Sequence, residues 1–179
     1  MWRAGNAGGV SLLELLIALA VAAVLLSTGV PGFRDLVQDN RRAARVNRLV
    51  HALHLARSEA IKQAEYVTLC KSATGLDCGS GGVRWDDGWI VFTNRDHDEP
   101  AHTDAGEGIL LREPPIDDLT LTGNRNAFTF RPFHRRSTNG TIVFCDSRGP
   151  ASARAVIISH TGRPRVSARR PDGGPLPCP

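Results

Sequence analysis

The chain has 179 residues, 41% of them hydrophobic, which is enough for one packed domain plus an appendage. The net charge of +4 is mild but uneven, because residues 131–179 carry +7 and residues 1–130 carry −3. Positive charge is therefore concentrated in the C-terminal region, which predicts that this region binds an anionic partner.

An apolar segment lies near the N-terminus, at residues 10–30, and holds one charged residue, Glu14. Twenty-one helical residues are long enough to cross a hydrocarbon core of about 30 Å. The basic leader containing Arg3 predicts a cytoplasmic N-terminus, so the rest of the chain would lie outside the cytoplasm. Gly8 and Gly9 come before the apolar run and not after it, so we expect the run to be retained in the mature protein.

Glu14 is unusual inside such a segment. A carboxylate within a membrane helix costs about 2.5–3.5 kcal/mol on insertion scales. Glu14 either extends toward the membrane surface from a position near the helix end, or it has a charged partner and a function.

The stretch "GGVSLLELLIALAVAAVLLSTGVP" resembles the class III signal of type IV prepilins. The resemblance implies a leader of residues 1–9, cut after Gly9 by a prepilin peptidase that also methylates Val10. Glu14 is then the fifth mature residue and Pro31 the twenty-second, where pilins have a helix-kinking proline. In a filament the new amine of one subunit would pair with Glu14 of a neighbour. The family prefers Phe where this chain has Val10.

The helical pattern continues through residues 31–65 after an interruption at Gly29, Pro31 and Gly32, where we expect a kink. Apolar residues then recur every three or four positions, with arginines between them, which predicts an amphipathic helix with one buried face. The two segments together form one helix of about 55 residues, or roughly 80 Å at about 1.5 Å per residue.

From residue 66 to residue 179 the pattern changes to short β-rich runs separated by Gly, Asn, Asp and Pro. Eight runs without an intervening helix predict an antiparallel β head. The runs are residues 66–70, 88–92, 108–112, 119–121, 127–131, 141–145, 155–159 and 165–168.

Four cysteines form no C-x-x-C pair and complete no zinc site, so in an exported protein they predict two disulfides. Three pairings are possible. We favour Cys70–Cys78, which would close a local loop, and Cys145–Cys178, which would anchor the C-terminal tail.

The chain resembles the GspH/FimT family of minor pilins and pseudopilins in the sequence and order of four segments. They are "ARSEAIKQAEYVTLC", "WDDGWIVFTNRDHDE", "FRPFHRRSTNGTIVFC" and "AVIISHTGRPRV". The resemblance implies an α+β fold in which a long N-terminal helix packs on an antiparallel, β-sandwich-like head. It also implies other pilins as filament partners. The expected location is the inner membrane, with a periplasmic head, and then the pilus.

No enzyme motif is present, because the chain lacks G-x-S-x-G, H-E-x-x-H and a P-loop. We therefore expect no enzymatic activity, cofactor or metal. An acidic stretch could bind calcium, but its spacing is not that of an EF-hand, and a solvated loop between strands is the favoured interpretation. Its acidic residues are Asp96, Asp98, Glu99, Asp104 and Glu107.

The segment "TGRPRVSARR" is the main candidate for function. Gly162 permits a turn with positive φ. If residues 163–168 are extended, Arg163 and Arg165 point to one side, about 7 Å apart, a spacing similar to that of successive DNA phosphates. Further arginines would extend or flank this patch: Arg169, Arg170, Arg148, Arg154, Arg135 and Arg136.

Within the family, a G-R-x-R motif near the C-terminus marks FimT-type pilins that bind DNA, and Gly162, Arg163 and Arg165 match it. The resemblance thus implies a minor pilin that binds double-stranded DNA without sequence preference and supports natural transformation. The alternative is a structural minor pilin or a type II secretion pseudopilin without DNA binding, in which the basic loop only keeps the head soluble.

Overall fold

In the computed structural model, residues 9, 11–133 and 136–178 are described. The chain forms two compact units, one ending at Arg41 and one beginning at Arg42, and each is considered by itself. Val10 and most of the leader, residues 1–8, lie outside the described residues, so the expected cut after Gly9 is not tested.

One helix, α1 (Leu12–Gln63), belongs in part to each unit. Ser11 caps its start, since the Glu14 backbone N–H donates to Ser11 Oγ at 3.2 Å. Its end is marked by Ala64, whose positive φ of 56° is typical of the residue after a helix. The helix is continuous through Pro31, and the kink expected there stays a prediction.

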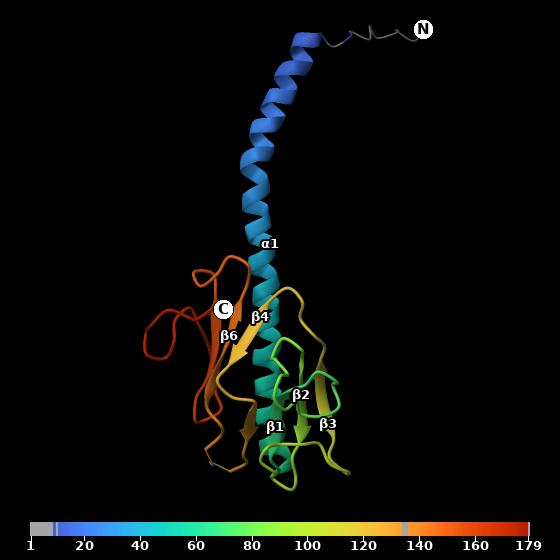
Figure 1. The fold of residues 1–179 in the computed structure, drawn as a ribbon, viewed down its shortest axis with the longest axis vertical. Coiled ribbons are helices and arrows are strands. Elements are labelled where there is room, and N and C mark those ends of the chain that lie inside the picture. Colours follow the sequence, from blue (N-terminus) through green and yellow to red (C-terminus); the bar gives the residue numbers. More distant parts are fainter. Residues whose placement is uncertain (1–8, 10, 134–135, 179) are drawn as a thin grey trace, which may run out of the picture. The chain divides into compact units, whose positions relative to one another are not determined.

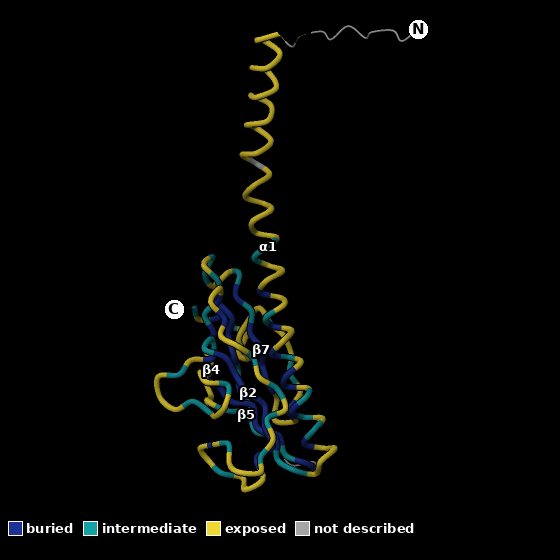
Figure 2. Tube along the Cα trace, turned by 90° about the vertical axis from the view of Figure 1, so that its right-hand side faces the viewer, coloured by how far each residue is buried: buried dark blue, intermediate teal, exposed yellow. Residues whose placement is uncertain are grey.

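The N-terminal part of α1 is apolar and exposed. Its most apolar window has a mean hydropathy of 2.3, and none of that window is buried (Figure 2). By length and composition this is a helix that could cross a membrane, which is compatible with membrane anchoring.

The second unit contains two four-stranded antiparallel sheets, with strand orders β3-β2-β1-β5 and β4-β6-β7-β8 (Figure 1). The first sheet comprises β1 (Val67–Lys71), β2 (Trp89–Thr93), β3 (Ile109–Glu113) and β5 (Ala127–Phe130). The second comprises β4 (Thr120–Gly123), β6 (Gly140–Cys145), β7 (Arg154–Ile158) and β8 (Pro164–Ser167). All eight expected strands are confirmed to within two residues at each end.

The C-terminal part of α1 packs against both sheets. Leu49, Leu53, Ala56 and Ala60 follow one another at steps of three and four and are completely or almost completely buried. They share a core with residues of both sheets, such as Phe128 of β5 and others on β6 and β7. The amphipathic pattern of residues 31–65 therefore packs on the sheets from Val46 onward, and the fold is the α+β arrangement expected.

Both favoured disulfides are present. Cys70 pairs with Cys78 and Cys145 pairs with Cys178. The second bond holds the C-terminal tail on the outer face of its sheet, where Leu176 packs in a small cluster with Val143, Ala155 and Ile157.

Candidate functional site

The turn between β7 and β8 has the positive φ expected at Gly162, with a value of 71°. A Cβ at this position would lie 2.9 Å from two ring carbons of Phe130 and 3.2 Å from Ser137 Oγ. Only glycine therefore fits both the backbone angle and the space. The turn is closed by two backbone hydrogen bonds, from Gly162 N to Ser159 O and from Ser159 N to Arg163 O.

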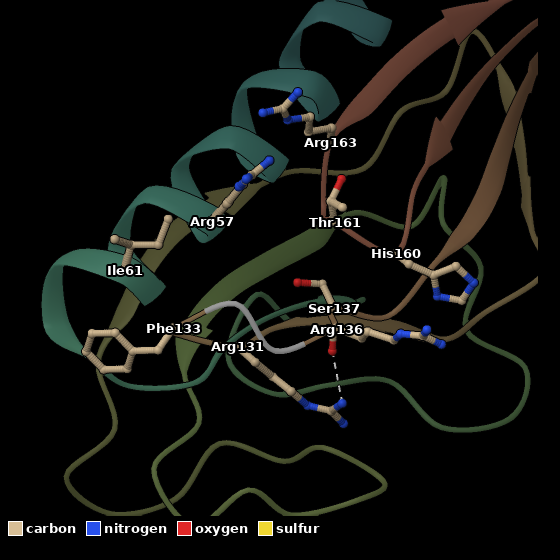
Figure 3. A pocket seen from close by; sticks show the side chains of 9 residues that line it. All are labelled: Arg57, Ile61, Arg131, Phe133, Arg136, Ser137, His160, Thr161 and Arg163. Atoms are coloured by element: carbon tan, nitrogen blue, oxygen red, sulfur yellow. Dashed lines mark hydrogen bonds between the residues drawn. The ribbon is translucent and has the colours of Figure 1, made fainter.

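Arg163 borders an open cavity of about 800 Å³ between this turn, the loop after β5 and α1 (Figure 3). Ser137 joins two of these walls, because its backbone N–H donates to His160 O at 2.9 Å. We call this cavity the arginine pocket. Its lining residues are Arg57, Ile61, Arg131, Phe133, Arg136, Ser137, His160, Thr161 and Arg163.

The arginine pocket is strongly cationic. Four arginines and a histidine line it, and no carboxylate is among its lining residues. Within the described part of the chain, Arg57, Arg136 and Arg163 form no ion pair with a carboxylate. Arg131 donates to the carbonyl oxygen of Arg136 at 3.0 Å, which links the two ends of the loop after β5. A concentration of guanidinium groups without acids is suited to an anionic ligand.

Arg165 lies elsewhere on the same edge of the head. The extended segment begins at Pro164, so the alternation that would put Arg163 and Arg165 on one side does not include Arg163. The register places Arg165 opposite Ile157, a member of the outer-face cluster, whereas Arg163 lines the arginine pocket. The two arginines are both exposed, but they border different surfaces of the edge strand β8.

Arg169 and Arg170 are exposed in the tail that follows β8. Arg169 donates to Gly173 O at 3.2 Å, and Arg170 pairs with Asp172 at 3.4 Å. These contacts fold the tail on itself, and they leave the charge of Arg170 partly neutralised.

Arg148 and Arg154, expected to flank the patch, are used within the fold. Arg148 pairs with Asp146 at 2.7 Å, and the buried Arg42 reaches the same carboxylate at 2.7 Å. Arg154 donates to the carbonyl oxygens of Ser152 and Ala153. Sequence reasoning did not use the short separation between Arg148 and Asp146, and the contact of Arg42 with Asp146 joins residues that are far apart in the chain. Arg135, the other expected flank, lies outside the described residues.

Asp146 has an altered pKa. Burial alone would raise the pKa of this carboxyl, but hydrogen bonds from Arg148, from Ser152 Oγ at 2.6 Å and from Arg42 outweigh burial. The pKa of Asp146 is therefore held well below its ordinary range. This carboxylate is a structural anchor for two arginines.

The acidic loop after β2 brings together Asp96, Asp98 and Asp104, whose carboxylate oxygens lie within 4.8 Å of one another. Burial, together with Asp96 and Asp98, raises the pKa of Asp104. Some of the loop's carboxylates accept hydrogen bonds from its backbone, such as Glu107 from Arg95 N–H and Asp98 from His102 N–H. Exposed acidic groups of this kind are common without a metal, and these contacts fit the favoured interpretation as a solvated loop.

The N-terminal candidates lie in the first unit. Gly9 is exposed, and Glu14 is exposed in the first turn of α1, where a negative charge is favourable next to the helix N-terminus. Ser11 and Glu14 also have the S-x-x-E spacing of a capping box, a signal that sequence reasoning did not use.

Comparisons with known proteins agree with this fold. Residues 45–162 match the family model described as Type II transport protein GspH. Two crystal structures of the type IV minor pilin FimU of Pseudomonas aeruginosa also match, at 18% and 19% identity. The first has a TM-score of 0.53 and covers 76% of this chain and 93% of FimU, and the second has a TM-score of 0.49 and covers 76% and 96%. No curated protein matches the chain. The chain therefore belongs to the GspH family and has a type IV pilin-like fold.

Proposed function

We propose that this chain is a minor pilin of a type IV pilus that binds extracellular DNA and supports DNA uptake in natural transformation. The observation that carries the proposal is the arginine pocket, in which Arg163 of the G-R-x-R motif lies among three further arginines with no carboxylate in the lining. Arg165, exposed on β8, extends the cationic edge beyond the pocket.

The chemistry favours phosphate as the group that is bound. Guanidinium is planar and always charged, and it forms paired hydrogen bonds with phosphate oxygens. Contacts to phosphates alone carry no sequence information, so binding should be independent of sequence. That property suits a pilus that captures any incoming DNA.

The test is DNA binding by the full-length protein in neutral detergent, measured by fluorescence anisotropy with labelled duplexes of two unrelated sequences. Both duplexes should bind equally, and with about four contacts log Kobs should fall with log salt at a slope of about −3.6. The double variant Arg163→Gln and Arg165→Gln should remove most of the binding and reduce the slope by about 1.8.

Arg95→Gln is the matched control, because Arg95 is exposed in the acidic loop, outside the arginine pocket. This variant should bind as the parent does. Equal affinities of the parent and the double variant would disprove the assignment of the motif.

The second candidate function is a pseudopilin of type II secretion, which the description of the matched family favours. In that case the basic edge would have no nucleic-acid ligand. Absence of DNA binding by the parent at low salt would favour this function over the first.

Both candidate functions require the same N-terminal processing and the same pairing between subunits during filament assembly. We infer that prepilin peptidase cuts after Gly9 and that the new amine of Val10 pairs with Glu14 of a neighbouring subunit in the filament. The apolar part of α1 would first anchor the chain in the inner membrane with its N-terminus in the cytoplasm.

Glu14→Ala should leave cleavage intact but abolish incorporation into filaments, as measured by immunoblotting of sheared pili. Normal incorporation would rule out the pairing.

A further inference from the structure

We propose that the arginine pocket accepts an unpaired nucleotide whose base stacks on Phe133, so that the protein prefers DNA with a single-stranded end over blunt duplex. The inference rests on the proposed DNA-binding function and adds to it the form of DNA that the site selects. Four observations support it, and each concerns the described lining of the pocket.

The first observation is the exposure of Phe133. Its side chain is 70% exposed, although a phenylalanine ring gains considerable free energy from burial. Phe133 lines the arginine pocket, and Figure 3 shows the ring at one end of the cavity. An exposed aromatic ring at the wall of an open cavity is available to a ligand.

The second observation is the backbone of Phe133. Its φ of 54° lies in the left-handed region, which bulky residues rarely adopt. Residues kept in such conformations cluster at ligand-binding sites, because the surrounding structure must hold them there. Here the preceding Pro132 is buried and fixes the loop immediately before the ring.

The third observation is the chemistry around the ring. Arg131 and Arg136 flank it in sequence, and Arg57 and Arg163 line the same cavity from α1 and from the β7–β8 turn. Aromatic rings combined with a cationic surface are the usual means by which proteins bind single-stranded nucleic acid, with bases stacked on the rings and arginines on the phosphates. Ile61, which is 56% exposed on α1, adds apolar surface that a base could cover.

The fourth observation is size. The cavity of about 800 Å³ falls within the range of about 300–1,000 Å³ that is typical of small-molecule pockets, so it can admit a nucleotide. A base inside a duplex has both faces covered by its neighbours and cannot stack on a protein ring without leaving the helix. Unpaired bases at a DNA end avoid this cost, and they should therefore be preferred.

A competing explanation is that Phe133 and Ile61 form an apolar contact with another pilin. The charge of the pocket favours nucleic acid over this explanation, because an apolar protein contact would bury four arginines beside it without a carboxylate from this chain. A pilin contact is retained as an outcome of the test.

The experiment compares two DNA probes on the full-length protein in neutral detergent: a blunt duplex, and the same duplex with a short single-stranded extension. The parent should bind the extended probe about tenfold more tightly than the blunt one, since stacking one base contributes an effect of about this size or larger. Phe133→Ala should abolish this preference, so that the variant binds the two probes with equal affinity.

Two further variants separate stacking from apolar contact. Phe133→Trp retains an aromatic face and should retain the preference, whereas Phe133→Leu is apolar without such a face and should lose it. Because Phe133 is exposed, all three variants should melt at the parent's temperature.

The inference is overturned if the parent binds both probes equally, or if the preference persists in Phe133→Ala. If the preference persists and Phe133→Ala also blocks incorporation into filaments, Phe133 forms a pilin contact. In these cases blunt-duplex binding that depends on Arg163 and Arg165 still supports the proposed function. If the parent binds neither probe, the proposed function fails, and this inference fails with it.

Discussion

The two parts of α1 show that one continuous helix can be built for two different surroundings. Up to Leu36 the large apolar side chains that the structure describes are exposed, as Leu13 and Leu25 illustrate at 66% and 65%. In the second unit Leu49 and Leu53 are completely buried by the sheets of the same chain. The head thus provides an apolar environment for one part of the helix, and the exposed apolar surface of the other part is compatible with membrane anchoring.

The second unit begins at Arg42, the first buried residue of α1 among those whose burial the structure describes. Its guanidinium and the Asp146 carboxylate meet at 2.7 Å with side-chain exposures of 6% and 5%. The preceding Arg41 is exposed. The comparison between the two parts of α1 can therefore be tested at single residues.

The largest effect is expected from Asp146→Asn. Removing the carboxylate from a buried pair typically costs about 3–5 kcal/mol, because the partner charge stays buried. Urea denaturation, followed by the fluorescence of the buried Trp85 and Trp89, should show a loss of this size at neutral pH. Arg41→Gln is the control and should change stability by less than about 0.5 kcal/mol. A small change in unfolding free energy for Asp146→Asn would mean that the Arg42–Asp146 ion pair does not stabilise the second unit.

The same pair predicts a pH dependence. The pKa of Asp146 is depressed in the folded state, so its stabilisation is fully present above the unfolded pKa of about 3.9. It is lost progressively as the pH falls below that value. The difference in unfolding free energy between the parent and Asp146→Asn should accordingly shrink as the pH is lowered from about 4. A difference that does not change with pH would show that the pKa of Asp146 is not depressed.

The comparison is sharpest for two leucines of the same helix. Leu53→Ala should lower the stability of the head by about 2–5 kcal/mol through lost burial and a residual cavity. Leu25→Ala, at an exposed position, should leave the same unfolding transition within about 0.5 kcal/mol. Equal effects of the two variants in neutral detergent would show that the parts of α1 do not differ as described.

Replacing Cys145 and Cys178 by Ala should have a smaller effect. The bond closes a segment with a sequence separation of 33, and losing a disulfide typically costs about 2–4 kcal/mol. The Cys70–Cys78 bond closes a segment with a separation of only 8, so its removal should cost less in the chain-entropy description. Thermal melting of the two double variants checks the order, and a reversed order would contradict the loop-length argument.

The smallest effect is expected at the start of the apolar part. Ser11→Ala removes the oxygen that accepts the Glu14 N–H, at a cost of about 1 kcal/mol to the first turn. Circular dichroism in detergent should show slight fraying of the helix end and no change in head unfolding. Ser11→Asp, which keeps a capping oxygen, should preserve the helicity.

The sequence predicts most of the fold because its signals are local. The helix, the eight strands and the position of the turn at Gly162 each depend on residues close together in the chain. The disulfides follow from an even cysteine count and from the short separation between Cys70 and Cys78.

The candidate site is harder to predict, because its members come together only through the fold. Arg57 is one of several arginines of the amphipathic helix, and Phe133 follows the expected strand at residues 127–131, yet both line the cavity next to Arg163. Arg148 looked available for a ligand, but Asp146, only two residues away, neutralises it. The convergence of Arg57, Phe133 and Arg163 on one cavity depends on sheet register and helix packing, and these are not local properties.

The Cys145–Cys178 bond has a further consequence for how the tail responds to proteases. The segment from Arg169 to Gly173 is exposed, so a protease would reach it easily. A cut there would leave the released piece attached through Cys178, and it would be visible on a gel only after reduction. A nicked chain would thus keep Leu176 packed on the sheet and remain folded.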